Sequence, residues 1–150
     1  PRSDKHSIIS RNDSGGETNA AYILNHKCNW DIYNDEFNII MPVNGVYYVY
    51  STPFTSPTKL VFCSKGSSPI HKMFFLKKDI DSRIKGIDLQ RKYLYMLNGV
   101  YSFPTSKQFG IFIMETAEKI TRNILIQELS LNYKNHTAKH LDKLLNIGGY

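Results

Sequence analysis

The chain has 150 residues, of which 41% are hydrophobic and 13% aromatic, and a formal net charge of +6. This length suits one domain with a sizeable core, and the composition excludes a disordered chain. Because no run of about 18 apolar residues and no leader with an apolar core are present, we expect neither a membrane span nor an export signal within these residues.

The positive charge is spread along the chain, and no run of Lys and Arg is denser than a Lys-Lys pair. No zinc-finger or RNP-type pattern accompanies these residues. The charge therefore predicts a basic surface that suits a sulfated polysaccharide and predicts no nucleic-acid partner.

In chain order, residues 1–18 are polar and contain Gly and Ser, which predicts a flexible lead-in. A domain over 19–133 follows, with Pro42 to Gly45 as a turn. The predicted strands are 20–24, 30–33, 37–40, 46–50, 59–64, 71–80, 92–103, 109–116 and 123–131. Short strands at this spacing, separated by loops rich in Ser, Pro, Thr and Gly, predict an all-β fold, specifically an antiparallel jelly-roll sandwich.

The tail over 134–150 has a different pattern. Ala138, Leu141, Leu144 and Leu145 fall on one helical face, and Gly148-Gly149 provides a natural stop. We predict a short amphipathic helix packed on the domain rather than a last strand.

The strand at 46–50 is apolar on both faces, because Val46, Tyr48 and Tyr50 alternate with Tyr47 and Val49. The stretches 93–96 and 109–114 share this property. Burial of one large aromatic side chain contributes about 1.5–3 kcal/mol, so several exposed together would form an unusually large patch. This predicts a homo-oligomer in which copies cover the second face; the alternative is a monomer in which the tail helix covers it.

Four segments carry a family resemblance: "AAYIL" (20–24), Trp30 in the following segment, "PVNGVYYVYS" (42–51) and "LNGVYSF" (97–103). Over about residues 19–131 the chain resembles the tumour necrosis factor superfamily, as a divergent member. The motif at 42–51 is the most specific of the four.

The resemblance implies a cytokine-like extracellular ligand, secreted or shed from a type II membrane precursor whose stalk lies outside these residues, with 1–18 as the remnant of that stalk. Such ligands are jelly-roll homotrimers that bind and cluster cysteine-rich receptors in the clefts between subunits. By this resemblance the trimer seam falls on Tyr48, Tyr50, Tyr95 and Met96, with one or two of them facing the monomer core instead. Receptor contact falls on the loops 64–70 and 81–91, with Ile70, Arg83 and Lys85 as candidates.

The two cysteines, Cys28 and Cys63, are either bridged to each other or two buried thiols. Neither belongs to a CxxC zinc pattern. Asn12 and Asn135 each begin a glycosylation sequon, which favours a glycoprotein.

An enzyme is not predicted. His136 and His140 stand at i and i+4, but the Glu of an HExxH site and a third ligand are missing. No nucleophile elbow or phosphate-binding Gly loop occurs, so we expect no catalytic residue, metal or cofactor. The alternatives to a receptor ligand are a C1q-like or lectin-like trimeric recognition module and a basic protein that binds polyanions.

Overall fold

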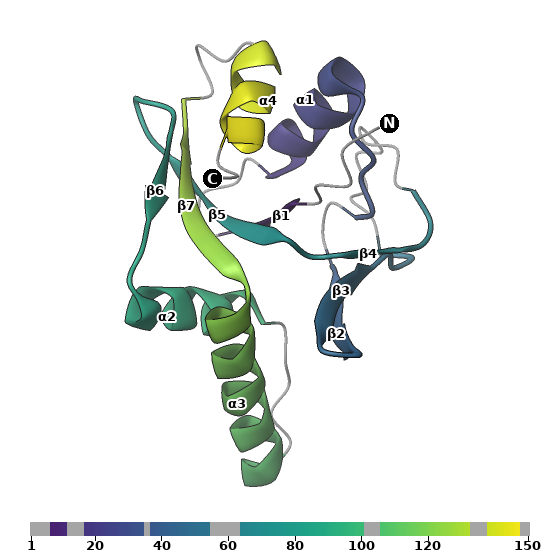
Figure 1. Cartoon of the computed structure of the whole chain (residues 1–150), viewed down its shortest axis with the longest axis vertical. Coiled ribbons are helices and arrows are strands. Elements are labelled where there is room, and N and C mark those ends of the chain that lie inside the picture. Colours follow the sequence, from purple (N-terminus) through teal and green to yellow (C-terminus); the bar gives the residue numbers. More distant parts are fainter. Residues whose placement is uncertain are drawn as a thin grey trace.

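The computed structural model describes residues 7–11, 17–34, 37–54, 64–100, 106–132 and 138–147. These residues form a mixed helix and strand fold with a four-stranded sheet, ordered β1-β5-β7-β6, and a three-stranded sheet, ordered β2-β3-β4 (Figure 1). The elements are β1 (Ser7–Arg11), α1 (Glu17–Cys28), β2 (Ile39–Val43), β3 (Val46–Tyr50), β4 (Ser67–Pro69), β5 (Lys72–Lys78), β6 (Arg83–Gly86), α2 (Leu89–Gly99), α3 (Lys107–Asn123), β7 (Leu125–Leu131) and α4 (Ala138–Ile147).

The four-stranded sheet is the centre of the molecule. Strand β5 runs parallel to both of its neighbours, β1 and β7, while β6 pairs antiparallel with β7 at one edge. In β5, Phe74 and Leu76 enter the core on one face of the sheet, and Met73 and Phe75 enter the core on the other. The continuous apolar run of β5 is typical of a strand in a parallel sheet that is covered on both faces.

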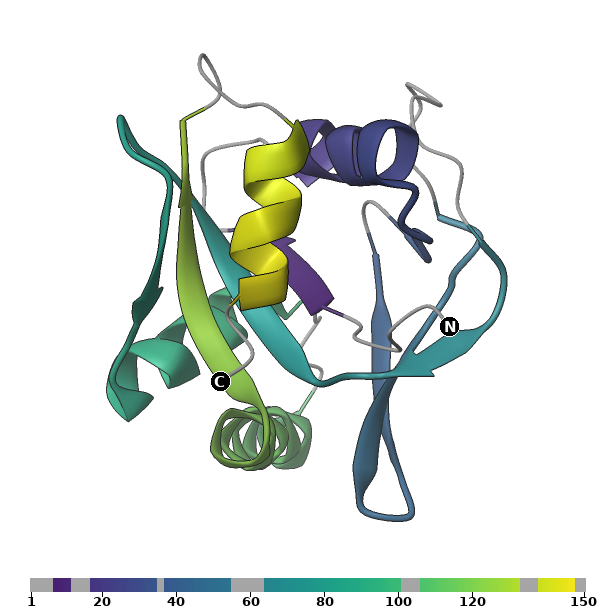
Figure 2. The ribbon, with the colours of Figure 1, turned by 45° about the horizontal axis from the view of Figure 1, so that its top comes forward.

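Helices α1 and α4 cover one face of this sheet (Figure 2). Leu24 of α1 and Leu141 and Leu145 of α4 are buried against Phe74 and against strand β7. The expected tail helix is therefore present as α4, and it packs on the central sheet rather than on the 46–50 strand.

Helices α2 and α3, together with the small sheet, cover the opposite face. Met96 of α2 and Ile120 of α3 share a core cluster with Phe75, and Val49 of β3 reaches the same cluster. The N-terminal half of α3 extends away from the rest of the molecule (Figure 1). The fold thus has three layers, with the hydrophobic core divided by the central sheet.

The expectation of an all-β jelly roll is wrong where the predicted strands 20–24, 92–103 and 109–116 overlap α1, α2 and α3. The predicted strand 30–33 is also absent, since these residues hold only a single bridge at Ile32. Side-chain caps favour the helices. The Asp88 carboxylate accepts a hydrogen bond from the Arg91 N–H at 2.8 Å, and the Ser106 hydroxyl accepts one from the Phe109 N–H at 3.2 Å. A continuous apolar run fits a helix as well as a strand, and the caps select the helix for α2 and α3.

Other predicted elements are present. Strands β3, β5 and β7 lie within the predicted 46–50, 71–80 and 123–131, and Asn44 and Gly45, with φ of 51° and 81°, form the two-residue turn before β3. The predicted strand at 59–64 lies almost wholly outside the described residues. Strand β1 lies within the stretch expected to be a flexible lead-in, where it pairs with β5.

Lys72 at the start of β5 is buried, and its Nζ donates a hydrogen bond to the Leu145 carbonyl oxygen of α4 at 3.1 Å. A cation near the last carbonyls of a helix stabilises it. Replacing Lys72 by Met would keep most of the volume but remove this donor, and we expect the free energy of unfolding to fall by about 1–3 kcal/mol.

Urea denaturation measures this loss, with Lys77→Met as the matched control because Lys77 is exposed on the same strand. Equal denaturation midpoints for the two variants would show that the bond to α4 does not stabilise the fold.

Candidate interaction surface

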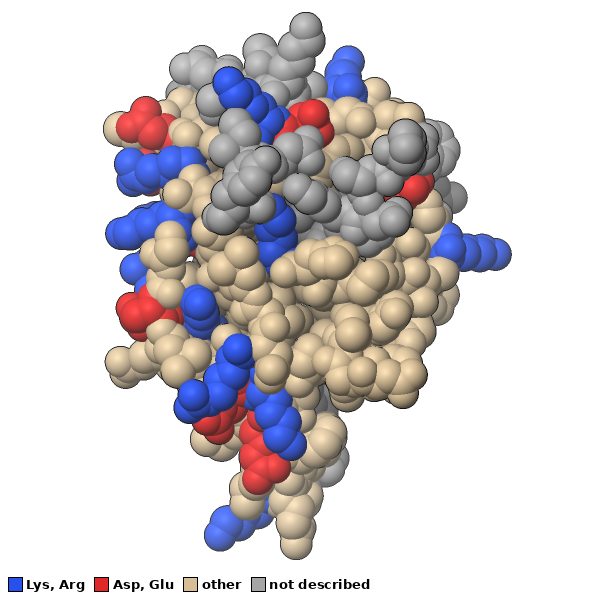
Figure 3. All heavy atoms as spheres, in the orientation of Figure 1, with Lys and Arg blue, Asp and Glu red and all other residues tan. Residues whose placement is uncertain are grey.

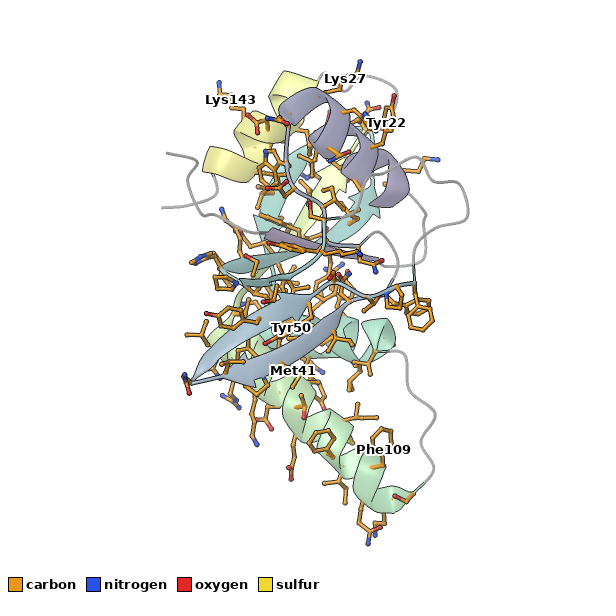
Figure 4. All side chains as sticks on the ribbon, turned by 90° about the vertical axis from the view of Figure 1, so that its right-hand side faces the viewer. Tyr22, Lys27, Met41, Tyr50, Phe109 and Lys143 are labelled. Carbon is orange, nitrogen blue, oxygen red and sulfur yellow. The ribbon has the colours of Figure 1, made fainter. Side chains whose placement is uncertain are left out.

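The outer side of the β2–β3 hairpin carries apolar side chains that solvent reaches. Pairing places Ile39 opposite Tyr50, Met41 opposite Tyr48 and Val43 opposite Val46. The four aliphatic side chains are 38–51% exposed, and the two tyrosines are half-buried. We call these six residues the hairpin face; Figure 4 labels Met41 and Tyr50 on it.

The inner side of the same hairpin belongs to the core. Val49 is buried there, and Ile40 and Tyr47 pack on the same cluster. Residues opposite each other across two antiparallel strands share one side of the sheet, so both sides of this hairpin are apolar. The second apolar face that the sequence indicates at 46–50 is therefore present and exposed in the single chain.

The surroundings of the hairpin face are uncharged. Residues 37–58 contain no Asp, Glu, Lys or Arg. In Figure 3 the lower right of the molecule, where the hairpin lies, shows no charged side chain, whereas Lys and Arg gather along the left edge. Depletion of charge with enrichment in Tyr and Met is typical of the centre of a protein interface.

Strand β2 forms one edge of the small sheet, and Pro42 lies within it. Proline has no backbone N–H to donate, so an added strand could not pair continuously along this edge. The hairpin is therefore suited to binding through its face rather than through its edge.

A second exposed apolar surface lies on the first half of α3. Four apolar side chains on this part of the helix are 39–61% exposed, and we call them the helix tip: Phe109, Ile111, Phe112 and Met114. The ring centroids of Phe109 and Phe112 lie 6.4 Å apart, with the rings stacked. Residues 108–114 contain no charge. A helix segment that is apolar around its whole circumference is normally buried, so the helix tip also has the character of a contact surface.

The residues predicted for the trimer seam divide between the surface and the core. Tyr48 and Tyr50 lie on the hairpin face. Met96 is buried inside the single chain, because α2 is a helix that turns this side chain towards the central sheet. Tyr95 is half-buried, and its ring lies 4.9 Å from that of Phe75.

Tyr95 belongs to a polar cluster between α2 and β7. Its hydroxyl donates to Glu128 Oε2 at 3.1 Å and accepts from Arg91 Nε at 2.9 Å, while Arg91 Nη2 lies 3.2 Å from Glu128 Oε2. The Tyr95 hydroxyl and the Glu128 carboxylate raise the pKa of Arg91. The three partners satisfy one another, so this cluster holds α2 against the sheet and does not resemble a catalytic site.

The residues predicted for receptor contact differ in whether they are buried or exposed. Ile70 is not a surface anchor, since it is 7% exposed and packs in the core beside Val49. Arg83 and Lys85 are exposed on the edge strand β6, where Arg83 pairs with Asp79 at 3.1 Å. A hydrogen bond from the Ile80 N–H, with Arg83 nearby, holds the pKa of Asp79 below its usual range. Charged residues on an edge strand also discourage sheet-to-sheet aggregation.

Cys28 is half-buried at the end of α1, beside α4. Burial raises the pKa of its thiol, and the charge of Asp142 raises it further. The Asp142 carboxylate also accepts a hydrogen bond from Trp30 Nε1 at 2.9 Å, which joins α4 to the segment after α1. Cys63, Asn12, Asn135 and His136 lie outside the described residues, so the possible bridge, the sequons and the histidine pair are not described.

Within the described ranges, no group of His, Cys, Asp and Glu side chains could hold a metal ion, and no helix is long and apolar enough to cross a membrane. Comparison with protein-family models, curated proteins and solved structures finds no match to this chain.

Proposed function

We propose that this protein works by binding rather than by catalysis, and that copies of the chain associate through the hairpin face. The observation that carries this proposal is an uncharged, solvent-exposed set of six apolar and tyrosine side chains on a sheet whose other side is already buried. At about 200 Å² for a large side chain, the exposed part of this face is roughly 400 Å², which is at the scale of functional patches on monomers.

The resemblance to the tumour necrosis factor superfamily suggests a more specific form of this function, namely an extracellular homotrimeric ligand that binds and clusters cysteine-rich receptors. The support for it is the motif at 42–51, which supplies four of the six residues of the hairpin face. The jelly-roll subunit belongs to the same hypothesis, but α2 and α3 occupy segments that it requires as strands. A sulfated polysaccharide is a further proposed partner, because Lys77 and Lys78 on β5 and Lys85 on β6, two strands of the same sheet, are exposed.

Light scattering after size exclusion tests the proposal. A mass of two or more chains is expected, and three chains would favour the receptor-ligand form, whereas two would favour association without it. A single species of one chain would contradict the proposed association.

A charged substitution locates the surface. An unpaired charge buried in an interface costs about 2–5 kcal/mol. Tyr50→Asp is therefore expected to raise the dissociation constant about a hundredfold, since 1.4 kcal/mol is tenfold. Circular dichroism should remain unchanged.

Ile80→Asp is the matched control, because Ile80 is 81% exposed outside the hairpin face. Equal dissociation by both variants would place the contact elsewhere.

A further inference from the structure

The helix tip and the hairpin face have matching properties. Both are uncharged, both are exposed, and each leaves roughly 400 Å² of mostly apolar surface if a large side chain offers about 200 Å². Figure 4 shows the hairpin turned towards the viewer, with the end of α3 marked by Phe109 extending below it. Both surfaces are thus accessible from the same side of one molecule.

We infer that the helix tip of one copy packs on the hairpin face of a second copy. The inference rests on the proposed self-association and specifies which surfaces meet. A helix lying on a sheet is one of the basic layer arrangements of proteins. The two surfaces together amount to about 800 Å² per copy, which is the area that each partner buries in a stable interface of standard size.

The dimensions of the two elements agree. The six helical residues from Phe109 to Met114 rise about 9 Å, and a helix with its side chains is about 10–12 Å across. Five-residue strands are about 17 Å long, and three strands about 4.8 Å apart span about 10 Å. The helix tip is therefore shorter than the hairpin strands and about as wide as the three-stranded sheet that carries the hairpin face.

The arrangement of side chains around α3 favours a second copy as the partner. With about 100° between successive residues, Phe109 and Phe112 lie on one side of the helix and Ile111 and Met114 on nearly the opposite side. The helix tip therefore needs cover on two sides. A second copy supplies two apolar surfaces at once, its hairpin face and its own helix tip, while Pro42 prevents it from adding as a strand at the β2 edge.

Disulfide cross-linking between different chains tests this pairing. The two native cysteines are first replaced by Ala, and single-cysteine chains carrying Met41→Cys or a helix-tip cysteine (Ile111→Cys or Phe112→Cys) are co-expressed with different affinity tags. Mixed assemblies are purified through both tags and oxidised. We expect Met41→Cys to cross-link to at least one helix-tip cysteine several-fold more than to the control Ile80→Cys.

Two results would overturn the inference while leaving self-association intact. One is mixed assemblies in which cross-links between two Met41→Cys chains dominate, which would indicate sheet-to-sheet packing. The other is mixed assemblies in which neither helix-tip cysteine exceeds the Ile80→Cys level, as expected if another protein or a lipid surface covers α3. Failure to recover any mixed assembly would instead contradict the proposed function itself.

Discussion

Replacing Phe74 by Ala is expected to lower the free energy of unfolding by about 3–5 kcal/mol, the usual cost of removing a fully buried aromatic ring. Phe74 is inaccessible to solvent in the middle of β5, beneath α1 and α4. Its removal leaves a cavity between the sheet and the helices α1 and α4. Because these elements are packed against one another, the neighbouring side chains can fill the cavity only in part.

Phe112→Ala is the matched control, since it removes the same atoms from a side chain that is 61% exposed. Measured by urea denaturation at a concentration where each variant is a single chain, it should change stability by less than about 0.5 kcal/mol. In light scattering we expect the opposite ranking. Phe112→Ala should weaken association more than Phe74→Ala does, because only Phe112 belongs to the helix tip. Equal losses of stability would mean that the first half of α3 packs inside the single chain.

The elements that the sequence predicts correctly have strong local signals. Asn44-Gly45 sets a two-residue turn that few alternatives satisfy, and the apolar run around Phe74 has Lys on both sides and is too short for a typical helix, which favours a strand. The tail helix has its apolar residues on one stripe, with Leu141 and Leu145 one turn apart. Each of these signals is contained within a few neighbouring residues.

The elements read incorrectly lack such a signal. The stretches 93–96 and 109–114 are apolar at nearly every position, and such a run does not distinguish a period of 2 from a period of 3.6. The information that decides them lies just outside, at Asp88 and Ser106, which cap the helices. A strand at 93–96 would put Met96 at an interface, whereas the helix turns it into the core.

The hairpin face could be predicted only in part. Tyr48 and Tyr50 follow from the alternation in 46–50, but a turn predicted from Pro42 to Gly45 leaves Met41 and Val43 out of the hairpin face. A two-residue turn at Asn44-Gly45 fixes the register, and hence pairs Val43 with Val46 and Met41 with Tyr48. Ile70 could not be recognised as buried, since its burial depends on a core cluster whose other members, such as Val49 and Met96, are remote in sequence.

Leu145→Ala in α4 is expected to lower the free energy of unfolding by about 2–5 kcal/mol, because Leu145 is buried against the central sheet. Leu144→Ala is the matched control: the same atoms are removed one position earlier in α4, from a half-buried side chain, and a smaller loss is expected. The measurement is urea denaturation of both variants at equal concentration.

This comparison also decides which apolar surface the tail covers. If α4 is required by the central sheet, as the burial of Leu145 indicates, it is not available to cover the hairpin face, and that face needs a partner from another molecule. Leu145→Ala should therefore weaken folding without a specific effect on association, whereas Tyr50→Asp should do the reverse. Equal, small effects of Leu144→Ala and Leu145→Ala on stability would mean that α4 is only loosely attached, and that the tail could cover the hairpin face in a single chain.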